Sequence, residues 1–331
     1  MNNNTIREIN KHFLLALILS CWFLTFSTGC DLFEVSFSDP QLENCIREEI
    51  KIFDDRKLTR GDLSSLISLD LSEKNISSLS GLEEARSLES LKLRGNNITD
   101  ISPLSKLKKL WEVDLRDNKI IDISPLSKLR NLEYLYLSGN KISDLSPLKK
   151  HHKLLVLDLQ GNLIRDISPL AGLSNLLELN LSNNRIYDIE AISNFHHLVE
   201  LNLSNNDIRN IPPVENMTAL WKLDLSNNYI IDISALEYLC NLNKLDLSQN
   251  RIDDISPLAG ITTLRELKLA GNTIRDVSSL SEMHSLESLT LPSPDTIDFS
   301  PLKKVKHIKI YDEQGKLFFS SEPRDIAGLG D

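Results

Sequence analysis

The sequence predicts an α/β repeat solenoid, a horseshoe whose concave side is a single parallel β-sheet. Two observations lead to this prediction. A Leu-x-x-Leu-x-Leu-x-x-Asn-x-Ile pattern begins at Leu66 and returns every 22 residues without an insertion. Each repeat also alternates leucine with polar residues before the asparagine, which is the period of a strand with one buried face. The 331-residue chain is therefore expected to be one array rather than several globular domains.

Eleven 22-residue units, which we call coils, share this pattern. Their first leucines are Leu66, Leu88, Leu110, Leu132, Leu154, Leu176, Leu198, Leu220, Leu242, Leu264 and Leu286. One coil buries too few aliphatic side chains to offset the entropy of ordering its backbone, so coils are expected to be stable only as a stack. Strands about 4.8 Å apart then predict an eleven-stranded sheet on the order of 50 Å long.

Each conserved position of a coil has a predicted structural role. In coil two, Leu91 and Leu93 point into the core. Asn96 stands where the chain leaves the strand, and its amide is expected to bond turn backbone in the interior. Ser102 and Pro103 are expected to cap and begin a short 3-10 or helical turn on the convex side. The predicted structural asparagine ladder consists of Asn96, Asn118, Asn140, Asn162, Asn184, Asn206, Asn228, Asn250 and Asn272.

Both ends of the array need caps, because the outermost coils would otherwise expose their cores. A helix beginning at Asp39-Pro40 carries Leu42, Cys45, Ile46 and Ile50 on one face and is expected to cover the first coil. A β-hairpin over 311–319, with its turn near Gly315, is expected to close the other end. The predicted organisation is 1–29 signal peptide, 30–65 linker and N-terminal helical cap, 66–302 repeats, 303–320 C-terminal cap and 321–331 tail.

The first thirty residues are typical of an export signal. Arg7 and Lys11 precede an uncharged apolar run over 13–26, and small residues then lead to Cys30. Gly29-Cys30 resembles the end of a bacterial lipobox, which implies that Cys30 carries a lipid and becomes the new N-terminus. Plain secretion and a retained anchor helix are the alternatives. The leading expectation is a lipid-anchored protein of the bacterial cell envelope, outside the cytoplasm.

Residues 35–320 resemble the bacterial internalin-like leucine-rich repeats, whose coils also have 22 residues. The Asp-Ile-Ser-Pro-Leu element at 100–104, 122–126, 166–170 and 254–258 is similar to that subclass, as is the Phe37-Ser-Asp-Pro40 segment of the N-terminal cap. The resemblance implies a leucine-rich-repeat horseshoe that binds another macromolecule, usually a protein, on its concave face. Eukaryotic phosphatase-regulator repeats share the coil length.

The polar positions beside the strand leucines do not contribute to the hydrophobic core, so the residue types found there are the best guide to function. Tyr134, Tyr136 and Val156 predict an aromatic and apolar island beside Trp111, within reach of Arg94 and Arg116. Acids and lysines alternate along the later coils and are expected to orient the partner, with ordinary solvated surface as the alternative. The predicted partner-binding residues are Arg94, Trp111, Glu112, Asp114, Arg116, Tyr134, Tyr136, Val156, Asp158, Glu178, Glu200, Lys222, Asp224, Lys244 and Asp246.

Other kinds of site have weaker support. The net charge of -10 disfavours a nucleic-acid partner. Neither catalytic motifs nor cofactor-binding motifs occur, so we expect no enzymatic activity and no cofactor. The recurrent aspartates that begin with Asp100 are expected to bond local backbone rather than calcium. His151-His152 and His196-His197 are expected to be surface residues, with no metal site. Cys45 and Cys240 are expected to be small buried or half-buried residues without a disulfide.

Three functions therefore compete. The leading one is a non-catalytic scaffold that binds a protein of unknown identity and is attached to a membrane through Cys30. The second is a carbohydrate or cell-wall binding module, because aromatic residues on an open surface suit sugars. The third is an intracellular phosphatase-regulator-like assembly scaffold, which would require a different interpretation of the N-terminus.

Overall fold

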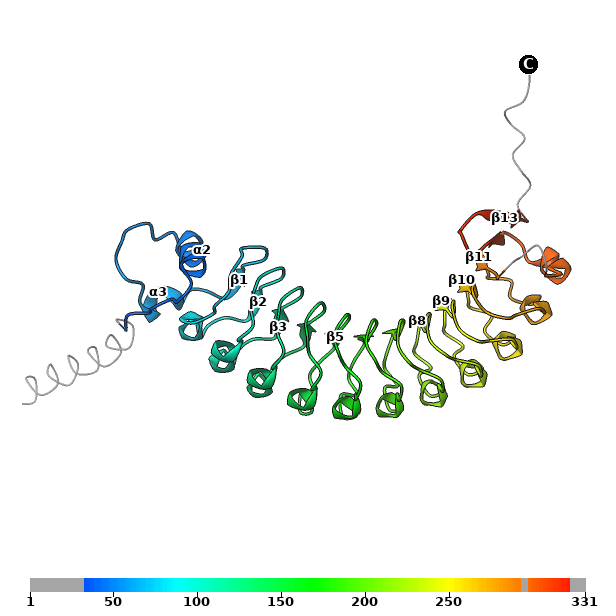
Figure 1. The fold of residues 1–331 in the computed structure, drawn as a ribbon, viewed down its shortest axis with the longest axis horizontal. Helices are drawn as coiled ribbons and strands as arrows, with labels where there is room; N and C mark the ends of the chain where they lie inside the picture. Colours follow the sequence, from blue (N-terminus) through cyan, green and yellow to red (C-terminus); the bar gives the residue numbers. More distant parts are fainter. Residues whose placement is uncertain (1–32, 293–296, 322–331) are drawn as a thin grey trace, which may run out of the picture.

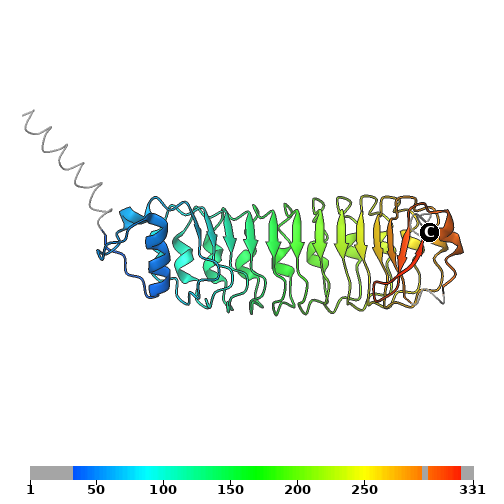
Figure 2. The same cartoon turned by 90° about the horizontal axis from the view of Figure 1, so that it is seen from above.

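A computed structural model describes residues 33–292 and 297–321. Stacked coils form an arc with one continuous sheet along its inner side and short helices along its outer side (Figure 1). Viewed from above, the strands lie side by side along the whole length (Figure 2). The predicted horseshoe with a parallel concave sheet is therefore confirmed. The expected signal peptide, Cys30 and residues 322–331 lie outside the described residues.

The sheet has thirteen strands, which follow one another in chain order. They are β1 (Ser68–Asp70), β2 (Ser90–Lys92), β3 (Glu112–Asp114), β4 (Tyr134–Tyr136), β5 (Val156–Asp158), β6 (Glu178–Asn180), β7 (Glu200–Asn202), β8 (Lys222–Asp224), β9 (Lys244–Asp246), β10 (Glu266–Lys268), β11 (Ser288–Thr290), β12 (Lys309–Tyr311) and β13 (Leu317–Ser320). Leu69 pairs with Leu91, and the same register repeats from coil to coil because every repeat has the same length.

The eleven coils contribute the eleven strands expected, and the expected C-terminal hairpin adds β12 and β13 to the same sheet, which therefore has thirteen strands instead of eleven. Leu289 pairs with Ile310 in parallel, so the step of 310 − 289 = 21 residues still adds a twelfth parallel strand. β13 then returns antiparallel to β12 and forms a hairpin. Gly315 adopts a φ of 76° in its turn, a conformation that glycine tolerates without strain. The C-terminal cap therefore continues the sheet and ends it with its only antiparallel pair among the described residues.

Short 3-10 helices line the convex side. They are η1 (Leu82–Glu84), η2 (Ser102–Lys106), η3 (Ser124–Lys128), η4 (Ser146–Leu148), η5 (Ser168–Leu170), η6 (Glu190–Ile192), η7 (Pro212–Val214), η8 (Ser234–Leu236), η9 (Ser256–Leu258), η10 (Ser278–Leu280) and η11 (Ser300–Lys304). The expectation that Ser102 caps its helix is wrong. Asp100 Oδ1 accepts a hydrogen bond from Ser102 N at 2.8 Å, and Ser102 Oγ donates to Asp100 Oδ2 at 3.0 Å. The recurrent aspartates therefore hold local backbone.

The asparagine ladder joins neighbouring coils. Asn118 Nδ2 donates to Leu115 O in its own coil and to Leu93 O in the preceding coil, at 3.1 and 2.9 Å. Its Oδ1 accepts from Ile98 N at 3.0 Å. The same three contacts recur from Asn96 to Asn272. Each ladder residue therefore satisfies buried backbone groups of two coils at once.

The core is a continuous column made mainly of leucine and isoleucine, and one histidine lies within it. His151 is fully buried, so the expectation of a surface histidine is wrong at this position. It occupies the inward site that Leu129 and Leu173 occupy in adjacent coils. Its two ring nitrogens lie 3.2 Å from Leu148 O and 3.0 Å from Leu126 O. Burial, the largest influence, lowers the pKa of His151.

Two helices close the N-terminal end. α2 (Pro40–Ile50) buries Leu42, Cys45 and Ile46, and α3 (Arg60–Leu63) follows it. Asp39 Oδ1 accepts from Gln41 N at the start of α2, whereas Oδ2 accepts from Ser77 N at 2.7 Å. One carboxylate therefore caps the helix and ties it to coil one. Cys240 is exposed, contrary to expectation, because it lies on the outer flank of its coil.

Candidate functional site

The candidate binding face is the concave surface of the sheet. In β1 to β11 the central leucine or valine is buried, whereas the first and third residues lie on the open side. Among the third residues of strands β1 to β11, only Asp114 is buried, with 4% of its surface exposed. The predicted partner-binding residues that belong to β3 to β9 therefore lie on one surface. The other three, Arg94, Trp111 and Arg116, lie outside the strands and flank this surface.

The aromatic island of Tyr134, Tyr136 and Val156 lies beside Trp111, as the sequence predicted. The rings of Trp111 and Tyr134 meet edge to face with their centroids 5.7 Å apart. Arg116 places its guanidinium carbon 5.1 Å from the centre of the Tyr136 ring, a cation–π contact. Tyr134 pairs with Val156 across β4 and β5, which continues the apolar surface into the next coil. Both tyrosines of β4 are therefore held in place, Tyr134 by an aromatic contact and Tyr136 by a cation–π contact.

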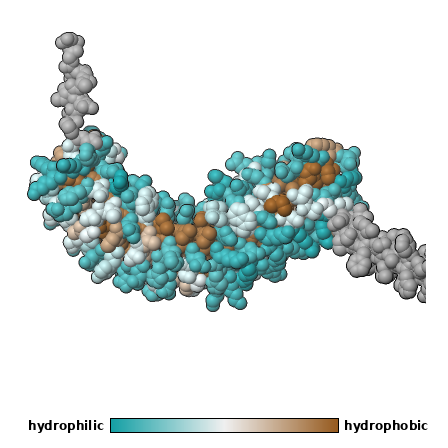
Figure 3. All heavy atoms as spheres, turned by 180° about the vertical axis from the view of Figure 1, so that it is seen from behind, coloured by the Kyte–Doolittle hydropathy of each residue, from teal (hydrophilic) through white to brown (hydrophobic). Residues whose placement is uncertain are grey.

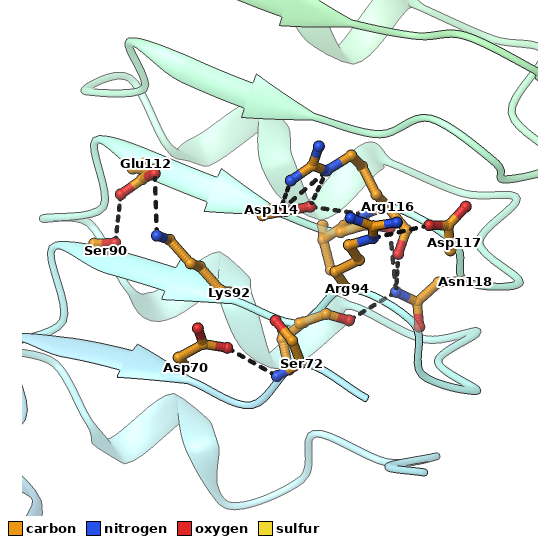
Figure 4. Close-up of polar contacts among 12 residues, drawn as sticks. Asp70, Ser72, Ser90, Lys92, Arg94, Glu112, Asp114, Arg116, Asp117 and Asn118 are labelled. Atoms are coloured by element: carbon orange, nitrogen blue, oxygen red, sulfur yellow. Dashed lines mark hydrogen bonds and ion pairs between the residues drawn. The ribbon is translucent and has the colours of Figure 1, made fainter. Parts of the chain in front are cut away.

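The two arginines predicted near the island have different partners (Figure 4). Arg116 Nε lies 2.9 and 3.1 Å from the two oxygens of Asp114, so the guanidinium forms a hydrogen-bonded ion pair with this buried carboxylate. Arg94 instead pairs with Asp117 at 3.1 Å on the loop after β3. Glu112 accepts a hydrogen bond from Ser90 Oγ at 2.6 Å. Arg116 is therefore fixed beside the island, whereas Arg94 is held at the edge of the concave face.

A hollow of about 230 Å³ begins at the island and runs across the next strands. Arg116 and Tyr136 form one end, and Lys222 forms the other. Its floor is the buried leucines of β5 to β7, and its polar lining includes Asp158, Glu178 and Glu200. The sequence indicated a charged strip, the alternating acids and lysines from Glu178 to Lys268, as a feature separate from the island. The structure joins the island and the first part of this strip into one recess.

The charges around this recess are unevenly paired. Lys222 contacts Glu200 at 3.2 Å, and Arg116 contacts Asp114. Asp158 and Glu178 make no ion pair within residues 33–292 and 297–321. Burial, followed by the charges of Glu112 and Glu178, raises the pKa of Tyr136, so its phenol stays neutral. The recess therefore carries a neutral aromatic ring beside two uncompensated carboxylates.

The charged strip beyond the recess is more fully paired. Lys268 lies 3.5 Å from Asp246 and 3.4 Å from Glu266, and Lys244 lies 3.5 Å from Glu266. Burial works against the charge of Lys268, but Asp246 and Glu266 outweigh it and raise its pKa. Burial also raises the pKa of Asp224. This internal pairing makes the strip a weaker candidate for recognition than the recess.

The comparisons with known proteins match this geometry. A family model described as "Leucine Rich repeats (2 copies)" matches overlapping segments spanning residues 86–260, and a second, "Leucine rich repeat", matches 240–293. Among solved structures, an internalin (inlF) from Listeria monocytogenes is 32% identical, with a TM-score of 0.73, over 86% of this chain and 91% of that one. The chain belongs to the internalin-like leucine-rich-repeat proteins.

Two further structures resemble this internalin-like protein. Internalin C2 (inlC2) of Listeria monocytogenes is 30% identical, with a TM-score of 0.55, over 71% of this chain and 94% of that one. A leucine-rich-repeat protein of Leptospira interrogans is 24% identical, with a TM-score of 0.66, and shares the fold over 76% of this chain and 74% of that one. No curated protein matches the sequence significantly. Leucine-rich-repeat scaffolds are typical protein-interaction modules.

One feature of this internalin-like protein escaped the sequence prediction. The residues just before β5 to β8 are Leu155, Leu177, Val199 and Trp221, which we call the apolar edge. The last three are exposed, and Trp221 contacts Lys244 at 5.7 Å. Hydrophobic colour follows the inner edge of the solenoid near the middle of the arc, whereas the outer side is hydrophilic (Figure 3). The sequence could have indicated this edge, because four consecutive coils carry an apolar residue at the same position.

The described part of this internalin-like chain offers neither a metal site nor a membrane-spanning helix. Within residues 33–292 and 297–321, no group of three or more His, Cys, Asp or Glu residues is arranged to hold a metal ion. His152 and His196 are exposed and lie against backbone carbonyls of neighbouring coils. In the same residues no helix is both long and apolar enough to span a bilayer.

Proposed function

We propose that this protein is a non-catalytic scaffold that captures a protein partner on its concave face. The recess between Tyr136 and Lys222 carries this proposal, because it combines an aromatic wall, an apolar floor and unpaired charge. Tyrosine, tryptophan and arginine dominate the energetics of protein interfaces. Trp111 and Tyr134 extend the aromatic surface beside the recess and provide a larger anchor for the partner.

The chemistry of the recess selects a cationic group. Asp114 neutralises Arg116, and Glu200 neutralises Lys222, so the residual charge comes from Asp158 and Glu178. A lysine or arginine of the partner would meet these carboxylates and the face of Tyr136 together. Aliphatic parts of the same segment would lie on Val156 and the apolar edge. The paired strip beyond β8 then favours one orientation of the partner over others.

A double alanine variant tests this assignment. Tyr134→Ala with Tyr136→Ala removes the centre of the island and is expected to weaken capture by about 30-fold or more, the loss of about 2 kcal/mol typical of one interface hot spot. Tyr187→Ala with Tyr238→Ala is the matched control, because both tyrosines are more than half exposed and lie outside the concave face. Quantitative capture with the full chain compares the two, and thermal unfolding checks that both remain folded.

Two results would redirect the proposal. Equal capture by both double variants would remove the island from the interface. Binding to a glycan array that Tyr136→Ala abolishes would identify a carbohydrate partner instead.

We also propose that a lipid on Cys30 holds the protein at the bacterial envelope, outside the cytoplasm. The apolar run over 13–26 and the small residues that lead from it to Cys30 support this attachment. Metabolic labelling with a fatty acid is expected to mark the full chain and to be lost in Cys30→Ala. Labelling that persists in this variant would exclude Cys30 as the attachment site.

A further inference from the structure

A basic surface lies on one flank of the early coils, although the protein as a whole is acidic. Segments 106–109, 128–130 and 149–153 contain eight lysine and arginine residues and no acid. The corresponding segments of coils five to ten, from 171–175 to 281–285, contain no lysine or arginine and three glutamates. The net charge of -10 therefore conceals a strong local separation of charge. We call the three early segments the basic flank.

Contacts between these segments bring them together on one surface. Each runs from a convex 3-10 helix back to the next strand, and all eight cationic side chains are exposed. Lys108 Nζ donates to Lys128 O at 3.2 Å. Asn131 Nδ2 donates to Lys108 O, and Lys153 Nζ donates to Asn131 Oδ1 at 2.8 Å. The three segments thus lie side by side on successive coils.

The positive charges of the basic flank are almost unneutralised within the chain. Lys106 lies 3.9 Å from Glu84, at the limit of an ion pair. The other seven cations make no ion pair in the part of the chain that the structure describes. Burial, followed by the charges of Lys128 and Arg130, lowers the pKa of Lys108. Like charges therefore repel one another here, and an external anionic surface would relieve that repulsion.

We propose that the basic flank docks on the anionic headgroups of a lipid bilayer and orients the anchored horseshoe. Seven of the eight cations are lysines, which act as point charges and suit a diffuse phosphate surface. The flank begins in coil two, close to the N-terminal cap, and Phe33 follows Cys30 by only three positions. The choice of a bilayer rests on the proposed Cys30 anchor, because a lipid there would hold the early coils beside the membrane.

Anchoring at one end leaves an elongated molecule free to tilt, so a second contact is needed to fix its orientation. The basic flank lies outside the concave face, on the return side of the coils. A protein resting on this flank would leave Tyr136 and the recess open to a partner. Attraction of this kind falls off within about 8–10 Å at moderate salt, so the contact requires close approach and is salt-sensitive.

Lysine footprinting on vesicles tests the contact. The full chain is bound to vesicles of phosphatidylcholine, with or without one third phosphatidylglycerol, and its lysines are acetylated with a water-soluble reagent. Lys108, Lys128 and Lys149 are expected to react about fivefold more slowly on the anionic vesicles at low salt, and equally on both in high salt. Lys119 and Lys141 serve as internal controls, because they are exposed in the turns that follow β3 and β4, at the opposite edge of the same coils. Equal labelling of Lys108 on both vesicle types would overturn the proposal.

A charge-matched pair of variants separates the flank from net charge. Replacing Lys108, Lys128 and Lys149 with glutamine is expected to weaken binding to the anionic vesicles roughly 100-fold. The same replacement of Lys74, Lys119 and Lys141, which are exposed at the opposite edge of the coils, is expected to leave binding unchanged, and equal losses would refute the flank. Binding to neutral vesicles reports the anchor separately, so its failure is distinguishable. Protection by soluble polyphosphate but not by vesicles would show that the partner is a polymer.

Discussion

Replacing Asn162 with alanine measures how strongly the asparagine ladder joins coils. Asn162 Oδ1 accepts from Ile142 N at 3.0 Å, and Nδ2 donates to Leu137 O and Leu159 O at 3.0 and 3.1 Å. Both carbonyls also accept from a neighbouring ladder asparagine. Alanine therefore leaves one buried N–H without a partner, whereas each carbonyl keeps one of its two bonds.

The expected loss in free energy of unfolding follows from this count. An unpaired buried N–H costs about 1–3 kcal/mol, and each of the two lost bonds about 0.5–1.5 kcal/mol. The expected destabilisation by Asn162→Ala is therefore about 2–6 kcal/mol. In a repeat array a weakened interface opens locally, so protection from hydrogen exchange should fall first in coils four and five.

Urea unfolding and hydrogen exchange measured by mass spectrometry provide the test. Asn97→Ala is the control, because Asn97 is an exposed loop residue whose Oδ1 accepts only from Lys119 Nζ among the side chains described. Its expected effect is within about 0.5 kcal/mol. A loss below 1 kcal/mol for Asn162→Ala, or protection that falls evenly along the array, would contradict a role for the ladder in joining coils.

Two further predictions concern stability. His151 has a lowered pKa in the folded state, so the unfolded state binds more protons as the pH falls below about 6.5, and folding stability is lost there. His151→Leu restores the residue type of the adjacent coils and should abolish this loss between pH 7 and 5; an unchanged pH dependence of urea unfolding would disprove the link. Gly81 has a φ of 100°, and a Cβ there would lie 2.7 Å from Ser36 O and from the Phe37 ring. Gly81→Ala should destabilise the N-terminal cap by about 1–3 kcal/mol, whereas Gly260→Ala, with open space around it, should have almost no effect on thermal unfolding.

The sequence predicted the architecture well because the repeat length determines the register. Equal spacing places Leu91 opposite Leu69 and Val113 opposite Leu91, with no further information needed. The prediction failed where residue type conflicted with position. His151 was assigned to the surface as a polar residue, although the aligned coils place it at an inward leucine position.

The sequence could not predict which side chains pair with each other at the candidate site, and the reason is different. Arg94 and Arg116 occupy the same position of consecutive coils, yet one pairs with Asp117 and the other with Asp114. That choice depends on rotamers and on the ring of Tyr136 in the next strand, which the repeat pattern does not specify. The apolar edge, by contrast, could have been predicted from Leu155, Leu177 and Val199. It was missed because these residues lie one position before the strands, where only the strand positions were considered.

Site-specific photo-crosslinking tests the central claim, recognition by the concave face, most directly. A photoreactive amino acid replaces Asn180, which lines the recess, or Tyr187 in the same coil, which lies outside the concave face, each in the full chain. Illumination is expected to give a covalent protein adduct from position 180 and none from position 187. An adduct that forms only from position 187, or equally from both, would contradict the claim that the concave face recognises the partner.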